Sequence, residues 1–418
     1  MAGNLQISGV DFDNYYIPAN NSVIGYTDRL LFGWGDNYFN NVVPDGAGLG
    51  NSPYFGTGKS SPIQIGTTTA WALISLSNST SWNNTYGPAY GPHSGGIKSN
   101  GTLWMWGSNY NGQLGFPRAA ISTVRTPVQV GALTNWSKLA CGAGSTLAVK
   151  TDGTLWSWGY NGNGALGLGD IVHRSSPVQV GAGTTWSNVF CTSGGTGGAG
   201  ASFAIKTDGT LWSWGYNGSG QLGLGDTTSR SSPVQVGALT TWSLISGGAY
   251  HSLAIKTDGT LWSWGYNGYG ASLGGALGLG DLVHRSSPVQ VGALTTWSKI
   301  AAGAISSAAI KTDGTLWSWG YNNVGQLGLG DTTSRSSPVQ VGALTTWSTV
   351  AGRTYWNDFI ISGFHAIKTD GTLWGWGIAT GLGEGSSSRS SPIQIGTSTN
   401  WNSVYGGGAG AMALKAGL

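Results

Sequence analysis

The sequence predicts an all-β fold, a seven-bladed β-propeller of four-stranded blades closed by N- and C-terminal strands that share one blade. One unit, clearest between Trp242 and Gly292, recurs along most of the chain. Its apolar residues alternate in short runs rich in β-branched and aromatic side chains, and no run has a helical period. The two ends of the chain match complementary parts of this unit. A repeated four-strand unit with matching ends is typical of a closed propeller.

Each unit contains four predicted strands, which in the clearest copy cover residues 242–246, 252–256, 260–264 and 288–291. Asp258 and Gly259 separate the second strand from the third, and Asp-Gly is a strong signal for a two-residue hairpin turn. The glycine-rich stretch between the third and fourth strands predicts a loop. Gly292 then opens the link to the next unit.

Three positions of the unit each occur seven times, which predicts seven blades. The fourth strand recurs from residues 62–65 to residues 392–395. The third strand ends at Gly35, Gly107, Gly159, Gly215, Gly265, Gly320 and Gly377. The unit opens at Trp71, Trp136, Trp186, Trp242, Trp297, Trp347 and Trp401.

The chain ends are out of phase with the blades. Residues 27–35 align with the turn and third strand of the unit, so the chain enters the ring at strand three. Residues 412–415 align with the second strand, so the chain leaves after strand two. The terminal strands can therefore complete one shared blade and leave no open sheet edge.

Tryptophan is unusually common, with 22 residues in the chain, and most of them occupy repeat positions. Trp262 and Trp264 lie two residues apart on the third strand, so both point to one face of the blade. Blades pack face to face, and each buried indole removes roughly 200 Å² from water. We therefore expect one such pair in each gap between neighbouring blades.

Composition limits the partners and the compartment. The formal net charge of +3 is too small to recruit nucleic acid or an anionic membrane by charge alone. No apolar run is long enough to span a membrane, and the N-terminus has no signal-peptide pattern. Two cysteines do not make a disulfide framework. These features predict a soluble protein, either virion-associated or cytoplasmic, without membrane insertion or nucleic-acid binding.

Two regions are expected. Residues 26–418 form a single propeller, whereas residues 1–25 lie outside the repeat and form an N-terminal arm. The arm mixes short apolar stretches with Tyr15, Tyr16 and Pro18. It is predicted either to cover a blade or to make an assembly contact with a partner.

The repeat pattern GxxHSLAIKTDGTLWSWG, followed by a glycine-rich loop and SPVQV, resembles that of the regulator of chromosome condensation family. The match covers about residues 26–418 in seven copies. The resemblance implies a seven-bladed propeller with interlocking ends that presents loops to a protein partner. Members of that family include a nucleotide-exchange factor for a small GTPase, a bacterial β-lactamase inhibitor and a plant ultraviolet receptor. No exchange-factor site carries over, because this sequence departs from the family pattern in its loops.

A four-stranded meander places its connections alternately on two faces of the ring. The hairpin face, as we call it, holds the hairpin between strands two and three and the link between blades, and their lengths do not vary. The insertion face holds the connections between strands one and two and between strands three and four. All five insertions fall on it, at residues 36–58, 77–92, 192–201, 269–275 and 353–363.

Aromatic residues in these insertions are the candidate binding residues. Trp82 and Trp356 are the two tryptophans outside the repeat positions. Aromatic side chains among small polar neighbours are typical of protein-binding surfaces. The alternative is that these side chains pack the inserted loops onto the ring. The candidates are Tyr38, Tyr54, Phe55, Trp82, Tyr86, Tyr90, Tyr355 and Trp356.

No group of residues predicts catalysis, a cofactor or a metal site. In four blades an aspartate precedes an arginine by four residues, as in Asp170 and Arg174, which predicts local ion pairs that fix a loop. The alternative is a basic ring, continued by Lys59 and Arg125, that binds a polyanion. Cys141 and Cys191 are predicted as buried thiols, with a disulfide as the alternative. His173 and His284 belong to blades that are not neighbours, which argues against a shared metal.

These observations predict a non-enzymatic structural or binding protein whose insertion face docks a protein or a glycan. The near-identical repeats resemble bacterial and phage members of the family, and the first hypothesis is a phage virion component of the tail, fibre or capsid surface. The second is a bacterial inhibitor or adhesin that plugs a protein partner. A small-GTPase regulator is the third.

Overall fold

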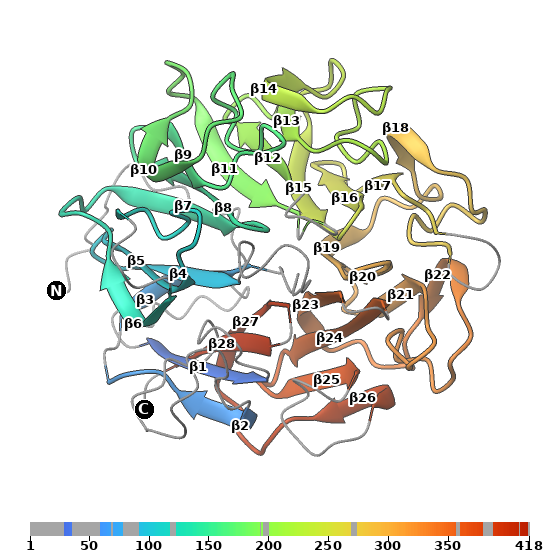
Figure 1. Cartoon of the computed structure of the whole chain (residues 1–418). Coiled ribbons are helices and arrows are strands. Elements are labelled where there is room, and N and C mark those ends of the chain that lie inside the picture. Colours follow the sequence, from blue (N-terminus) through green and yellow to red (C-terminus); the bar gives the residue numbers. More distant parts are fainter. Residues whose placement is uncertain are drawn as a thin grey trace, which may run out of the picture.

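Seven four-stranded antiparallel sheets surround a central axis as the blades of a propeller (Figure 1). The computed structural model describes residues 29–35, 59–67, 70–77, 92–117, 123–192, 194, 200–268, 274–356, 360–378, 388–408 and 410–416. The predicted fold class is confirmed. The arm, residues 1–25, lies outside the described residues.

We name the blades A to G in order around the ring. Blade A contains β1 (Arg29–Gly35), β2 (Lys59–Gln64), β27 (Trp401–Gly406) and β28 (Gly410–Ala416). Blade B contains β3 (Trp71–Leu76), β4 (His93–Lys98), β5 (Leu103–Ser108) and β6 (Thr123–Gln129). Blade C contains β7 (Trp136–Cys141), β8 (Ser145–Lys150), β9 (Leu155–Gly159) and β10 (Arg174–Gln179). Blade D contains β11 (Trp186–Cys191), β12 (Ala201–Lys206), β13 (Leu211–Gly215) and β14 (Arg230–Gln235).

Blade E contains β15 (Trp242–Gly247), β16 (His251–Lys256), β17 (Leu261–Gly265) and β18 (Arg285–Gln290). Blade F contains β19 (Trp297–Ala302), β20 (Ser306–Lys311), β21 (Leu316–Gly320) and β22 (Arg335–Gln340). Blade G contains β23 (Trp347–Trp356), β24 (Ile360–Lys368), β25 (Leu373–Gly377) and β26 (Arg389–Gln394). The first strand of each blade lies nearest the axis and the fourth strand lies at the rim (Figure 1).

The fourth strand differs from its predicted bounds, because β18 begins at Arg285 and not at Pro288. Arg285 pairs with Gly265 and Val289 pairs with Ser263, so a bulge lies between them. Pro288 has no N–H to contribute to a regular ladder, and Gly265 has a φ of 100°. The alternating pattern stops at the bulge, which is why it located only the second half of the strand.

The chain ends close the ring as predicted. In blade A the strand order is β2-β1-β28-β27, so the N-terminal strands supply the outer half and the C-terminal strands the inner half. β1 and β28 pair in continuous antiparallel register, from Arg29 opposite Ala416 to Gly35 opposite Gly410. The two central strands of this blade therefore come from opposite ends of the sequence.

Apolar clusters fill the junctions between blades, and the third-strand tryptophan lies in each of them. Trp264 of blade E packs with Phe203, Leu222 and Val236 of blade D. Its ring is fully buried, whereas Trp262 is only partly buried and lies toward the hairpin face. The prediction that tryptophan fills the gaps is confirmed for this position of the pair. The corresponding tryptophans at the other junctions are Trp34, Trp106, Trp158, Trp214, Trp319 and Trp376.

A backbone carbonyl in the glycine-rich loop of one blade binds two side chains of the next blade. Trp264 Nε1 and the Ser252 hydroxyl both donate to the carbonyl oxygen of Gln221, at 2.8 and 3.0 Å. At three further junctions an indole N–H and a hydroxyl likewise both donate to one backbone carbonyl, which belongs to Gln113, Ala165 or Ala276. This contact satisfies the indole N–H in the apolar gap, where an unpaired donor would be costly.

The glycine-rich loop is also the socket for the tryptophan. A Cβ at Gly223 would come within 2.8 Å of Trp264 Nε1, and the glycine has a φ of 75°. Gly167, Gly278 and Gly328 approach the indole of the next blade in the same way. The loop is glycine-rich because a backbone must touch an aromatic face there.

Replacing Gly223 by alanine is expected to destabilise the ring more than replacing Gly237. Both glycines have positive φ, so each substitution carries a backbone cost of about 1–2 kcal/mol. Gly237 has open space around its Cβ position, whereas Gly223 faces Trp264, which adds about 1–3 kcal/mol of overpacking. Urea unfolding of the two variants measures the difference, and equal midpoints would contradict the socket.

Candidate functional site on the insertion face

The predicted binding aromatics lie at the edge of the described structure or beyond it. Tyr38, Tyr54, Phe55, Trp82, Tyr86 and Tyr90 fall in segments 36–58 and 78–91, outside the described residues. Tyr355 and Trp356 are the last two residues of β23, where their backbones pair with Ile361 and Ile360. Their side chains are not described. Their role in binding stays a prediction.

The insertion at residues 353–363 differs from the loop that the sequence suggested. Strands β23 and β24 run past the length of their counterparts in the other blades and pair as an extended hairpin. Thr354, Tyr355 and Ile361 are β-branched or aromatic residues, which favour strands. Arg353, at the base of this extension, has a fully buried side chain close to Gly406 of blade A.

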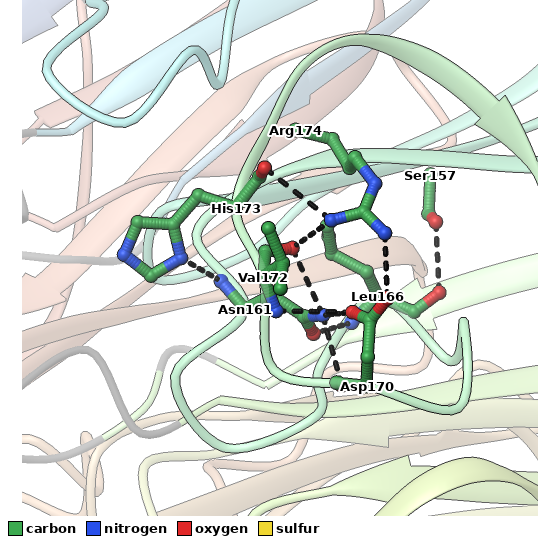
Figure 2. Close-up of polar contacts among 7 residues, drawn as sticks. All are labelled: Ser157, Asn161, Leu166, Asp170, Val172, His173 and Arg174. Atoms are coloured by element: carbon green, nitrogen blue, oxygen red, sulfur yellow. Dashed lines mark hydrogen bonds and ion pairs between the residues drawn. The ribbon is translucent and has the colours of Figure 1, made fainter.

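The described part of the insertion face consists mainly of the loops between strands three and four in blades C to F. In blade C the buried Asn161 organises this loop (Figure 2). Its amide nitrogen donates to the Asp170 carbonyl and carboxylate, both at 3.0 Å, and to the Val172 carbonyl. Its amide oxygen accepts the Leu166 N–H at 2.9 Å. One side chain thus fixes both arms of the loop.

Asp170 and Arg174 close the same loop with an ion pair of 2.6 Å (Figure 2). Arg174 also donates to the Val172 carbonyl at 2.6 Å. The Val172 N–H and then the Arg174 guanidinium hold the pKa of the Asp170 carboxyl below its ordinary value. The predicted local pairing is confirmed here and in blades D, E and F. These charges are used within the loop, which disfavours their use in binding a polyanion.

Arg125 does not continue the arginine ring as expected. Val124, not Arg125, pairs with Gly107 at the place where Arg285 pairs with Gly265. Arg125 stands two residues before Pro127, whereas Arg285 stands three residues before Pro288. This difference in spacing from the proline can be read in the sequence. The backbone of Lys59 does occupy the expected place, opposite Gly35.

The tips of these loops differ between alternate blades. Blade C exposes Ile171 and Val172, at 64% and 59%, and blade E exposes Val283 at 59%. Blades D and F carry a pair of threonines at the same positions: Thr227, Thr228, Thr332 and Thr333. Sequence reasoning missed these aliphatic residues, although the contrast between the D-I-V-H-R and D-T-T-S-R segments was readable.

A histidine follows each aliphatic pair and packs on a tyrosine. The ring of His173 lies 4.7 Å from that of Tyr160, and His284 lies 4.7 Å from Tyr266. His173 Nδ1 accepts the Asn161 N–H at 3.0 Å (Figure 2). In blade D the hydroxyl of Ser229 accepts the equivalent N–H from Asn217. The fold thus accepts serine here, so it does not itself require the histidine.

The hairpin face repeats one arrangement with little variation. Lys256 Nζ lies 3.5 Å from the ring centroid of Trp262 and 4.9 Å from that of Trp242. Trp262 Nε1 donates to Thr260, whose hydroxyl in turn donates to Asp258. The repeat lysines therefore cap tryptophans through cation–π contacts, a role that the charge pattern alone did not predict. Equivalent lysine caps involve Lys98, Lys150, Lys206, Lys311 and Lys368.

Two histidines join neighbouring blades near the insertion face. His93 Nε2 lies 2.8 Å from the Thr146 hydroxyl, and His251 Nε2 lies 3.0 Å from the Ser307 hydroxyl. Both hydroxyls already donate to backbone carbonyls, so the histidine N–H must be the donor. Burial lowers the pKa of His93 to about 3 and that of His251 to about 4. Both imidazoles are neutral structural groups at physiological pH.

Other chemical sites find little support in the described residues. Cys141 and Cys191 are both free thiols; Cys141 is buried, as predicted, whereas Cys191 is only partly buried. Burial raises the pKa of Cys141 to about 12. No three histidine, cysteine, aspartate or glutamate side chains of the described segments gather as a metal site. Within the same segments no helix is long and apolar enough to cross a membrane.

The chain belongs to the RCC1-like domain family, whose model matches residues 88–355. It is thus an RCC1-like propeller. A stretch of 127 residues is 32% identical to the ultraviolet-B receptor UVR8 of Arabidopsis thaliana and covers 30% of this chain and 28% of the receptor.

Two solved structures show the same fold along nearly the whole chain. Human WBSCR16 superposes with a TM-score of 0.74 at 19% identity, covering 93% of this chain and 99% of that chain. Prp20p of Saccharomyces cerevisiae gives 0.73 at 17% identity, covering 94% and 93%. Both likenesses concern the fold.

The buried histidines predict an acid-sensitive ring. In the unfolded chain His93 and His251 each bind a proton near pH 6.5, whereas in the folded chain they do so only near pH 3–4. Stability should therefore fall as the pH drops from 6.5 toward 4, by about 1.4 kcal/mol per pH unit for each histidine. His251→Ser should reduce this slope, because Ser145 and Ser306 occupy the same place in blades C and F. Urea unfolding between pH 7.5 and 4.5 measures it, and an unchanged slope would refute the assignment.

Proposed function

We propose that this protein is a non-enzymatic binding protein whose insertion face docks another protein. The observation that carries the proposal is the alternation of the loop tips. Blades D and F show that Thr-Thr-Ser suffices for the loop to fold, yet blade C exposes Ile171 and Val172 and blade E exposes Val283, in each case before a histidine. Binding residues are disproportionately carried on loops that a rigid scaffold positions, and these exposed aliphatic side chains lie on such loops.

The rigidity of these loops supports binding with a low entropic cost. The Asn161 network fixes the loop internally, and the Gly169 N–H donates to the Ser231 carbonyl of the next blade at 2.8 Å. In the equivalent loop of blade D, the Gly225 N–H donates to the Ser286 carbonyl of blade E at 2.8 Å. A preorganised loop does not have to be ordered at the moment of binding.

The comparisons support a protein as the partner. Prp20p of Saccharomyces cerevisiae binds Gsp1p and histones, and it has been solved with Kap60 bound. Those interactions belong to Prp20p, and they show that this fold can bind several proteins. We therefore favour a protein over the glycan that the sequence left open. The predicted aromatics of the insertions, Trp82 and Trp356 among them, would extend the same surface.

The biological setting remains a prediction. The named relatives are eukaryotic proteins and lend no support to a virion component, which rests on the style of the repeats alone. An inhibitor or adhesin uses the same face and stays the second hypothesis. The third hypothesis, a small-GTPase regulator, is supported by the likeness to Prp20p, and that likeness is one of fold only.

Charge on the blade C tip is expected to weaken docking without unfolding the protein. The double substitution Ile171→Glu with Val172→Glu changes two exposed residues, so the melting temperature should stay within about 2 °C. Desolvating the new carboxylates should weaken the partner complex about tenfold or more. Quantitative capture of partners from native extract, with mass spectrometry, compares the variant with the unaltered protein.

The matched control is Thr227→Glu with Thr228→Glu, at the same loop position in blade D. Partners should be lost with the blade C variant and kept with the blade D variant. A photo-crosslinking residue at Val172 should label the same partner, and one at Leu239 on the hairpin face should not. Equal capture by both variants, or labelling from Leu239 alone, would overturn the proposal.

A further inference from the structure

The exposed aliphatic tips of the insertion face occur together with histidine. His173 follows Val172 in blade C, and His284 follows Val283 in blade E, whereas blades D and F have threonine, threonine and serine at these places. Both histidines lie at the surface beside the exposed valines. The two blades that expose an apolar tip are therefore also the two whose tip contains a group that titrates near neutral pH.

A backbone hydrogen bond fixes the protonation state of each histidine. The Asn161 N–H donates to His173 Nδ1 at 3.0 Å (Figure 2). The Asn267 N–H donates to His284 Nδ1 at the same distance. Because a backbone N–H can only donate, each Nδ1 holds a lone pair and the neutral ring carries its proton on Nε2. Protonation of the ring adds the second proton at Nδ1 and abolishes this bond.

The donor of each bond is the asparagine that fixes the loop. The Asn161 side chain donates to the Val172 carbonyl at 3.2 Å. The Asn267 side chain donates to the Val283 carbonyl at 3.3 Å. Both asparagines are fully buried, where an N–H without an acceptor is costly. Loss of the histidine bond therefore acts on the residue that holds the aliphatic tip in place.

The tyrosine beside each ring leaves this bond as the part that acid changes. His173 packs on Tyr160 and His284 packs on Tyr266, each with ring centroids 4.7 Å apart. An aromatic face attracts a cation as well as an uncharged ring. The stacking therefore serves both charge states, whereas the bond to the asparagine serves only the neutral one.

The charged groups of the surrounding loops are already used in ion pairs. The blade B loop that packs against Arg174 has no charged residue between positions 108 and 117. Partial desolvation lowers the pKa of His173 from its ordinary value of about 6.5, so the ring is neutral at physiological pH and gains charge in mild acid. The pairs on the histidines' own loops and on the loops of blades D and F are Asp170–Arg174, Asp226–Arg230, Asp281–Arg285 and Asp331–Arg335.

Blade D contains the same loop with an acceptor that does not titrate. Its Ser229 hydroxyl accepts the Asn217 N–H at 3.2 Å. A serine hydroxyl stays neutral at these pH values and keeps its acceptor lone pairs. The blade D loop therefore serves as an internal control for any response of blades C and E to acid.

We propose that His173 and His284 make docking on the insertion face acid-sensitive. At neutral pH they hold the aliphatic tips of blades C and E in place for a protein partner, and in mild acid their protonation loosens the tips and releases that partner. The release rests on the proposed function, whereas the loosening of the loops does not. The two steps are therefore measured separately.

Hydrogen exchange of the backbone amides, followed by NMR, tests the loops without any partner. Between pH 7.0 and pH 5.0 the protection of the Asn161 amide should fall about tenfold or more relative to that of Asn217, because its acceptor is lost. Asn217 also reports any loss of stability of the whole ring in acid. In the His173→Ser variant the ratio should not change with pH. A constant ratio in the unaltered chain, or the same fall in the variant, would overturn the proposal.

Photo-crosslinking in native extract tests the release. A crosslinking residue at Val172 should label its partner about tenfold less at pH 5.0 than at pH 7.0, in parallel with the loss of protection. In a chain with His173→Ser and His284→Ser the labelling should be the same at both pH values, because serine keeps the acceptor without titrating.

Two results of this experiment would overturn the release. One is equal labelling by the unaltered chain at both pH values, and the other is an equal loss by the double variant, which would place the acid response elsewhere. Absence of labelling at pH 7.0 would overturn the proposed function and the release with it, while the exchange measurement would still decide whether the loops respond to acid.

Discussion

The structure depends on one contact, the insertion of a third-strand tryptophan into the glycine-rich loop of the preceding blade. At the junction of blades D and E the Trp264 ring is fully buried, its N–H binds the Gln221 carbonyl, and Gly223 lies against its face. The same loop then reaches the rim of the next blade through the Gly225 N–H and the Ser286 carbonyl. Each blade is thereby held by its neighbour, and both faces of the ring inherit their geometry from these junctions.

Most of the fold could be predicted because it rests on local signals that recur. The Asp-Gly pairs predict tight hairpins, and the paired tryptophans predict strands that are buried on one face. The chain ends match complementary parts of the repeat, which predicts a shared blade, and β1 pairs with β28 accordingly. The fourth strand was located less well, because the bulge before Pro288 breaks the alternation on which strand prediction relies. The extension of β23 was missed for a related reason, since an insertion with no repeat partner gives no register to compare.

The candidate site could be predicted only as a face. Topology alone placed the five insertions on one side of the ring, but a contact between side chains depends on distances that no pattern records. The Asp170–Arg174 pair was predicted because both residues are local, whereas the lysine caps on Trp262 and its counterparts join strands two and three through a geometry that charge counting does not reveal. The exposed tips at Ile171 and Val283 were visible in the sequence only as a departure from the neighbouring blades. In a repeat protein such departures are the better guide to function, because the repeat itself serves the ring.

The stability of the ring resides in the junctions between blades, and the shared blade A completes them. The β28 residues Met412 and Leu414 pack in the cluster between blades A and B, and Ala411 and Ala413 pack in the cluster between blades G and A. Removing residues 412–418 should therefore open two junctions, expose the edge of β1 and lower the unfolding midpoint strongly, with aggregation. Urea unfolding of the full and shortened chains tests this directly. A much lower midpoint supports the account, whereas an unchanged midpoint would show that the blades do not depend on ring closure.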